Sequence, residues 1–178
     1  MNHDAYDSDY IRDILVGVKT IAVVGASSNP VRPSYFVLKY LTDKGFDAYA
    51  VNPGIAGQQL LGKTVVAKLA DVPVPIDMVD VFRNSDAAMG VVEEALKLDP
   101  LPKVIWMQLG VRNDAAAAFA EAKGVRVVMN RCTKIEYGKH SGEWTWIGGN
   151  SGMISSQRLS RHDSGRMQSL GIDAGRRK

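Results

Sequence analysis

Small residues and an arginine stand near the start of the chain in a pattern suited to holding a phosphate group. In TIAVVGASSNPVRPSYF, residues 20–36, Gly25 begins a run of small side chains and Arg32 directly precedes Pro33. Small side chains let a ligand approach the backbone, and proline suits the first position of a helix. Because Arg32 offers no good side-chain cap, the first amides of that helix are left for an anion such as phosphate. A tight turn that holds no ligand is the alternative.

Five short apolar runs along the chain are typical of strands that alternate with helices. The expected strands are 21–24, 48–51, 78–82, 104–107 and 125–129. Strands separated by helical segments form a parallel sheet whose two faces are both covered. The pattern therefore predicts an α/β protein with a doubly wound, five-stranded parallel sheet and helices on both faces.

Helix signals lie between these runs. A short helix is expected around Asp9 to Val16, and a second begins at Pro33 and ends at Gly45. The expected apolar stripe of this second helix is Phe36, Val37, Tyr40 and Leu41. Residues 65–69 are expected to form another short helix within a segment rich in glycine and proline.

Two further helices are predicted in the second half of the chain. Ser85 is a plausible N-cap for the first of them, with Met89, Val92 and Leu96 facing inward. The second begins near Asn113, is rich in alanine and stops at Gly124. Together with the strands, these helices complete the predicted sheet by about residue 130.

Polar, small or cationic residues follow every expected strand. Ligands of an open parallel sheet bind beyond the carboxyl ends of the strands, because loops and helix N-termini meet there. The residues at these ends are 25–28, Asn52, Pro53, Arg83, Asn84, Gln108, Gly110, Asn130 and Arg131. The sequence thus places its most informative residues at one edge of the sheet.

The first turn departs from the pattern of classical NAD-binding proteins. That fingerprint is G-x-G-x-x-G, with a carboxylate about 20 residues further on for the ribose hydroxyls. Here Gly25, Ser27 and Pro30 occupy the glycine positions, and Asn52 follows the second strand where a carboxylate would be needed. The pattern disfavours a classical NAD dehydrogenase. An NAD(P)-binding oxidoreductase with an unusual turn remains as an alternative.

Five motifs in this order and spacing resemble a known family. VGASSNPVRPSY, VNP, DVFR, WMQLGV and MNRC are similar to the small bacterial CoA-binding proteins related to the N-terminal domain of the succinyl-CoA synthetase alpha subunit. The resemblance covers roughly residues 10–140. It implies a Rossmann-like domain that binds coenzyme A or acyl-CoA without catalysis. The phosphorylated histidine of the synthetase lies in a further domain that this chain is too short to contain, which argues against ligase chemistry.

The resemblance also implies roles for the residues at the strand ends. Ala26, Ser27 and Ser28 would hold the pyrophosphate, and the remaining residues would close the site or line its other parts. The full set of implied ligand residues is Gly25, Ala26, Ser27, Ser28, Arg32, Ser34, Asn52, Pro53, Phe82, Arg83, Gln108 and Gly110. Arg32 and Arg83 would pair with phosphate charge, whereas a structural salt bridge is the alternative for each arginine.

One set of residues resembles a nucleophile with a base. Cys132, Glu136 and His140 are spaced by four residues and would share one helix face. Cys132 and His140 would nevertheless be two turns apart, about 12 Å along the axis, which is too far for a hydrogen bond. We therefore expect no catalytic residue and a buried structural cysteine. A CoA-transfer enzyme that uses Cys132 is the alternative.

Two other residue sets could be mistaken for functional groups. Asp77 and Asp80 are three apart in the third expected strand, so they face opposite sides. They are interpreted as solvating the strand end rather than as an acid and a base. Trp106 falls inside an expected buried strand and is assigned to the core; Trp144 and Trp146 belong to the C-terminal segment.

Composition and charge set the remaining expectations. The net charge of +3 arises in the segment after Lys139, so a basic footprint for nucleic acid is not expected. The chain begins with polar, acidic residues and has no apolar run of ~20 residues. A single cysteine, Cys132, leaves no disulfide or cysteine-based zinc cluster and suits a reducing compartment. These features predict a cytoplasmic protein.

The chain is expected to divide into two parts. Residues 1–140 form the predicted Rossmann-like domain, and residues 141–178 a basic tail with a possible edge strand, EWTWI, and a flexible arm. The tail could instead pack on a second copy of the chain or on another protein. An interaction subunit is therefore the third functional hypothesis, beside a CoA-binding module and an enzyme.

Overall fold

A five-stranded parallel sheet forms the centre of the molecule. The computed structural model describes residues 1–141 of the 178-residue chain. The strands are β1 (Thr20–Val24), β2 (Asp47–Val51), β5 (Met78–Val81), β6 (Val104–Met107) and β7 (Arg126–Val128). Their spatial order is β2-β1-β5-β6-β7, and all neighbours are parallel. The five predicted strands are confirmed to within one residue at each end.

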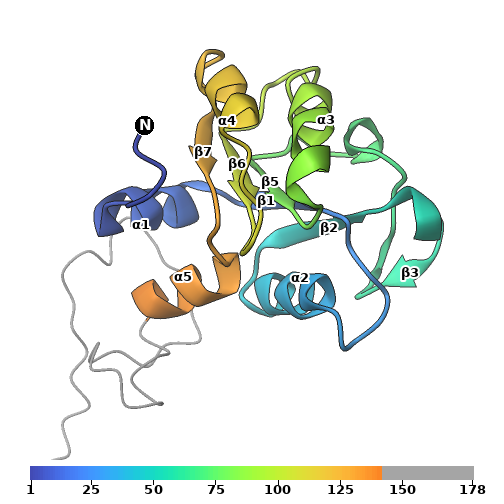
Figure 1. Cartoon of the computed structure of the whole chain (residues 1–178). Coiled ribbons are helices and arrows are strands. Elements are labelled where there is room, and N and C mark those ends of the chain that lie inside the picture. Colours follow the sequence, from blue (N-terminus) through green and yellow to red (C-terminus); the bar gives the residue numbers. More distant parts are fainter. Residues whose placement is uncertain (142–178) are drawn as a thin grey trace, which may run out of the picture.

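Helices cover both faces of this sheet (Figure 1). One face carries α1 (Ser8–Gly17), α2 (Pro33–Asp43) and α5 (Thr133–Ser141). The other face carries α3 (Ser85–Ala95) and α4 (Asp114–Glu121). Alternate strand residues enter the two cores, because side chains along a strand point to opposite faces. The α/β, doubly wound architecture predicted from the sequence is confirmed.

Helix α2 begins and ends where the sequence indicates, but its buried face is different. Pro33 is its first residue, and Gly45 follows it with a φ of 81°. The predicted stripe is wrong for Phe36, which is 50% exposed. The buried residues are Ser34, Val37, Leu38 and Leu41, which recur at helical spacing on one face. A polar residue, Ser34, therefore occupies the position nearest the start of the buried face.

The segment between β2 and β5 contains no helix at residues 65–69, so that prediction is wrong. It forms a hairpin of β3 (Gln59–Leu60) and β4 (Lys63–Thr64), followed by a short 3-10 helix, η2 (Leu69–Asp71). Leu61 and Gly62 both have positive φ, as a two-residue hairpin turn requires. The β-branched Val65 and Val66 then continue in extended backbone beside β2, where Val66 bridges to Val51.

The later helices largely match the sequence. Asn84, not Ser85, caps α3, because the Asn84 carboxamide accepts a hydrogen bond from Ala87 N. Ser85 Oγ is used elsewhere and accepts from Arg112 N. The predicted Asn113 start of α4 is confirmed, since Asn113 caps that helix. Ala88, Val91, Val92 and Ala95 form the buried face of α3, whereas Met89 and Leu96 are only partly buried.

Residues outside the sheet occupy both of its edges. At β7, Tyr6 Oη accepts a hydrogen bond of 2.7 Å from Met129 N, and Tyr10 Oη donates to Val127 O at 3.4 Å. At β2, Val66 N donates to Ala50 O, and Val66 O accepts from Asn52 N. Backbone groups at the two edges are thus partly paired, which limits further strand addition.

Residues 1–141 include no helix with both the length and the apolar composition needed to cross a membrane. Trp106 is fully buried on β6, as expected, and its indole N–H donates to Arg131 O at 2.7 Å. The predicted tail, with its edge strand and with Trp144 and Trp146, lies outside the described residues. The division at residue 140 stays a prediction.

Candidate functional site

The turn after β1 lies directly against the end of β5. Gly25 has a φ of 86°, which favours glycine. A Cβ at this position would lie 2.4 Å from Phe82 O and 3.0 Å from Arg83 Cδ. The turn therefore requires glycine for two reasons, its backbone conformation and the closeness of its neighbours. It also brings Gly25, Phe82 and Arg83, three predicted ligand residues, into contact.

Asn52 fixes the shape of this turn from the adjacent strand end. Its Nδ2 donates to Ala26 O at 2.7 Å, and its Oδ1 accepts from Gly54 N at 2.9 Å. Both ends of the carboxamide are thus engaged within the protein. Pro53, which is exposed, starts the short 3-10 helix η1 (Pro53–Ile55) directly after it. The structure gives Asn52 a structural task at the place where NAD-binding proteins carry a carboxylate.

The start of α2 is uncapped by any side chain. Arg32 occupies the N-cap position with extended backbone (φ −85°, ψ 139°) and makes no side-chain cap hydrogen bond. Pro33 has no N–H, and the amides of Tyr35 and Phe36 bond to Arg32 O. Ser34 is only 5% exposed, yet within residues 1–141 neither its N–H nor its hydroxyl has a hydrogen-bond partner. A buried serine at a helix N-terminus is therefore left for a group from outside the described fold.

The other turn residues surround this position. Ala26 is fully buried, while Ser28 is exposed. Ser27 Oγ accepts from Asn29 N at 3.1 Å, and Asn29 Oδ1 accepts from Val31 N at 3.0 Å. These two local hydrogen bonds hold the loop in shape without using the start of α2.

Both predicted arginines are exposed at this edge. Neither Arg32 nor Arg83 forms an ion pair with another residue of the described part of the chain. The structural salt bridge considered for each arginine is thus not seen among residues 1–141. Their guanidinium groups remain open to a phosphate, for which a charge-assisted hydrogen bond contributes about 1.5–3 kcal/mol.

The edge of the sheet at which the parallel strands end carries the predicted ligand residues, and we call it the ligand edge. Gln108 lies below the surface of this edge. The side chain is 4% exposed, and its Nε2 donates to Asp80 Oδ1 at 2.8 Å and to Thr133 Oγ1 at 2.9 Å. Thr133 Oγ1 in turn donates to Asp80 Oδ2 at 3.1 Å. The three residues, which we call the Asp80 network, join the ends of β5 and β6 to the start of α5. Gly110 is exposed, and its N–H donates to Asn130 Oδ1.

Asp80 corrects the interpretation of the two strand carboxylates. It is fully buried, so it does not solvate the strand end. Burial raises its pKa to about 7, although hydrogen bonds from Gln108 and Thr133 oppose that shift. Asp77 does lie at a strand end, where it accepts hydrogen bonds from the amides of Lys19 and Thr20 and pairs with Lys103. A carboxylate flanked by apolar residues inside a strand was the signal for burial of Asp80.

Among residues 1–141, no hydrogen bond joins the Cys132 thiol to the side chain of Glu136 or His140. Glu136 and His140 lie on the helix α5, and Cys132 directly precedes it. Cys132 is only partly buried, so the expectation of a buried cysteine is wrong. Burial raises the pKa of the Cys132 thiol and lowers the pKa of His140. The Glu136 carboxylate pairs with Lys139 at 2.9 Å. A raised pKa disfavours the thiolate, which is the reactive form of cysteine.

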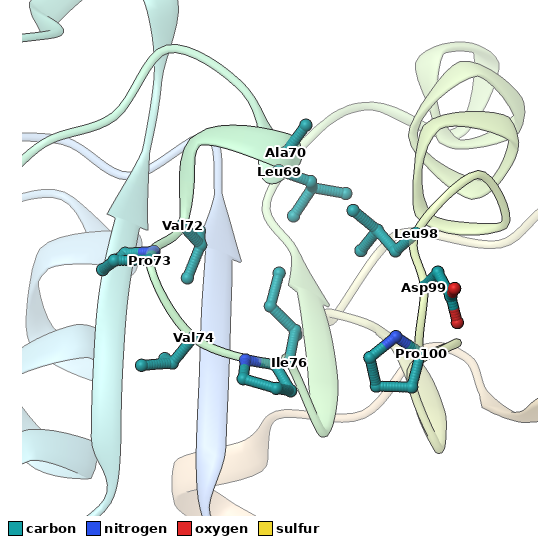
Figure 2. A pocket seen from close by; sticks show the side chains of 10 residues that line it. Leu69, Ala70, Val72, Pro73, Val74, Ile76, Leu98, Asp99 and Pro100 are labelled. Atoms are coloured by element: carbon teal, nitrogen blue, oxygen red, sulfur yellow. The ribbon is translucent and has the colours of Figure 1, made fainter.

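Two pockets lie away from the predicted ligand residues. One, of about 210 Å³, is lined by residues that precede β5 and β6, among them Ile76 and Pro100 (Figure 2). It sits on the amino-terminal side of these strands, and most of the residues that line it are of apolar types. The other, of about 300 Å³, lies between α1 and α5 and includes Arg131, Lys139 and His140. Neither pocket contains any of the twelve predicted ligand residues.

Comparison with known proteins gives the family. The sequence profile described as "CoA binding domain" matches residues 19–138, which include every strand of the sheet. The chain belongs to the CoA-binding domain family. This assignment confirms the resemblance that the five motifs indicated.

Relatives of this CoA-binding domain protein occur in bacteria and archaea. Protein YneT of Bacillus subtilis (strain 168), named as uncharacterized, is 40% identical over 127 residues, which are 71% of this chain and 91% of YneT. The solved structure of cell-free ID.343 from Thermus thermophilus is 36% identical, with a TM-score of 0.71. The match covers 75% of this chain and 98% of that one. Part of a larger enzyme, the dinucleotide-forming acetyl-coenzyme A synthetase 1 of Ca. Korarchaeum cryptofilum, is 26% identical, with a TM-score of 0.56. Here 65% of this chain matches 26% of the synthetase.

The hydrogen bond from Asn52 to Ala26 O gives a test of the turn. We expect Asn52→Asp to lower the free energy of unfolding at pH 8 by about 1–3 kcal/mol, because a carboxylate cannot donate and would face a carbonyl oxygen. Urea denaturation measures this change. Asn29→Asp is the matched control: the Asn29 side chain only accepts a hydrogen bond, from Val31 N, so this variant should lose little stability. Equal losses in the two variants would contradict this role of Asn52.

The buried Asp80 predicts a pH dependence of stability. The folded protein holds the Asp80 proton up to about pH 7, whereas an unfolded aspartate loses it near pH 4, so ionisation of this group destabilises the fold as pH rises between these values. We expect Asp80→Asn to become more stable relative to the wild type by roughly 3 kcal/mol between pH 4.5 and pH 8. Urea denaturation at both pH values measures the difference. A constant difference would contradict the raised pKa.

Proposed function

We propose that this protein binds coenzyme A or acyl-CoA without catalysis and holds the pyrophosphate at the β1–α2 turn. The observation that carries this proposal is the uncapped start of α2 with its buried, unpartnered Ser34. The positive end of a helix and free donors make an anion site, and a diphosphate satisfies both. Gly25, held against Phe82 O, lets such a group approach the backbone.

The residues present suit CoA rather than NAD. CoA carries a 3′-phosphate besides its pyrophosphate, and the exposed Arg32 and Arg83 add two positive charges to the same edge. NAD needs a carboxylate for its ribose hydroxyls, and Asn52 at that place is engaged with Ala26 and Gly54. The family description and the similarity to part of an acetyl-coenzyme A synthetase also support CoA as the ligand.

A binding role fits the chemistry of the described residues better than an enzymatic one. Burial raises the pKa of the Cys132 thiol, and no hydrogen bond within residues 1–141 joins this thiol to His140 or Glu136. We propose a carrier or sensor of CoA in the cytoplasm. Residues 142–178 would then be available for a partner.

Calorimetric titration tests the ligand. We expect CoA to bind more tightly than dephospho-CoA, because only CoA offers the 3′-phosphate to the arginines, and both to bind more tightly than NAD. Arg32→Gln and Arg83→Gln should narrow the difference between CoA and dephospho-CoA. Equal affinity for CoA and NAD, or no binding of either, would refute the proposal.

A substitution of Ser34 distinguishes an effect on ligand affinity from an effect on the stability of the fold. We expect Ser34→Ala to weaken CoA binding about tenfold, because a phosphate oxygen loses a hydroxyl donor. The free energy of unfolding of the free protein should not fall, because the hydroxyl has no partner in residues 1–141. Titration and urea denaturation of one variant give both quantities. A loss of stability with unchanged CoA affinity would show that Ser34 serves the fold alone.

A further inference from the structure

The nitrogen of the Gln108 carboxamide has hydrogen-bond partners, whereas its oxygen has none among the described residues. Its Nε2 is the donor to Asp80 and Thr133, and these contacts occupy both of its hydrogens. Its Oε1 accepts no hydrogen bond from any residue of the described part of the chain, although the side chain is only 4% exposed. A buried carbonyl oxygen without a donor costs about 1–3 kcal/mol, so a donor from outside the fold is expected to reach it.

Asp80 decides which end of Gln108 is available. A glutamine carboxamide can turn over and exchange its oxygen and its nitrogen. An ionised carboxylate accepts hydrogen bonds but donates none, so it accepts Nε2 and repels Oε1. No cation from β5, β6 or α5 contacts Asp80 in residues 1–141; its neighbours are Gln108, Thr133 and, as a titratable group, Cys132. Above about pH 7, where Asp80 is ionised, its carboxylate therefore keeps the Gln108 oxygen as the end left for a ligand.

The position of Gln108 in the sheet indicates which part of a ligand it meets. The strand order reverses between β1 and β5, and the nucleotide side of the proposed site lies at β1 and β2. Gln108 follows β6, which is two strands from β1 in the opposite direction, or about 10 Å. A ligand whose pyrophosphate lies at the β1–α2 turn would reach Gln108 with its pantetheine arm. This arm carries amide N–H groups, which are hydrogen-bond donors.

We propose that Gln108 Oε1, oriented by Asp80 and Thr133, accepts a hydrogen bond from an amide N–H of the pantetheine arm. The inference rests on the proposed function, and it deepens that function by assigning recognition of the arm to a buried network. Asp80 is a positioning residue in this arrangement, because it acts on the ligand only through Gln108. The nucleotide part of CoA is recognised separately, at the first turn.

Ligands with and without the arm test this assignment. At pH 8.5, where Asp80 is ionised, calorimetry would compare CoA with adenosine 3′,5′-diphosphate, which lacks the arm and the outer phosphate of the pyrophosphate. We expect Gln108→Met, which keeps the volume and removes both polar atoms, to weaken CoA binding about tenfold and to leave adenosine 3′,5′-diphosphate binding unchanged. Gln58→Met is the matched control, because Gln58 is exposed, lies between η1 and β3 and is not part of the Asp80 network.

Asp80→Asn tests the positioning role with an isosteric side chain that pairs with either end of Gln108. We expect a smaller loss of CoA affinity, about threefold, and again no change for adenosine 3′,5′-diphosphate. Unchanged CoA affinity in Gln108→Met, or an equal loss for both ligands, would overturn the inference and leave the proposed function standing. Failure of the wild type to bind CoA would overturn both. Binding of adenosine 3′,5′-diphosphate by each variant shows that the variant is folded.

Discussion

The contact between Gly25 and the carbonyl oxygen of Phe82 is the constraint on which the ligand edge depends. No other residue type could stand at position 25 without moving the end of β5 or the first turn, since even a Cβ would lie 2.4 Å from that oxygen. This closeness allows Asn52 to reach Ala26 O from one side and places Arg83 over the turn from the other. The start of α2 is left uncapped at the centre of these contacts, where an anion can replace the missing cap.

A second level of organisation lies below the surface of the same edge. Asp80, Gln108 and Thr133 join the ends of two strands to the start of α5 through hydrogen bonds that are shielded from water. A buried carboxylate with no cation beside it is costly and survives only because its neighbours supply donors. Those donors fix the carboxamide of Gln108 in one orientation. The ligand edge thus combines an exposed, cationic part at the first turn with a buried, oriented part at β6.

The sequence predicted the strands, the doubly wound sheet and the edge that carries the candidate residues, because apolar runs and the glycine and proline signals are local. It failed where the outcome depends on tertiary packing. Residues 65–69 have the apolar content of a short helix, but Val66 in this segment pairs with Val51 of β2. Phe36 directly precedes the buried Val37 in α2, yet its own side chain is exposed. Asn84 rather than Ser85 caps α3, and the Ser85 hydroxyl instead accepts a hydrogen bond from the backbone amide of Arg112, which is distant in the sequence.

The position of Asp80 among apolar strand residues is a local signal of burial, but no local pattern shows that Gln108 and Thr133 converge on its carboxylate. The two outer strands of the sheet affect how copies of this protein could associate. Tyr6 and Tyr10 close the side of β7, and Val66 closes the side of β2. Within residues 1–141, little unpaired backbone therefore remains at either edge for joining the sheets of two molecules. This arrangement favours contacts made by side chains of the helices and loops, which surface substitutions can alter without changing the sheet.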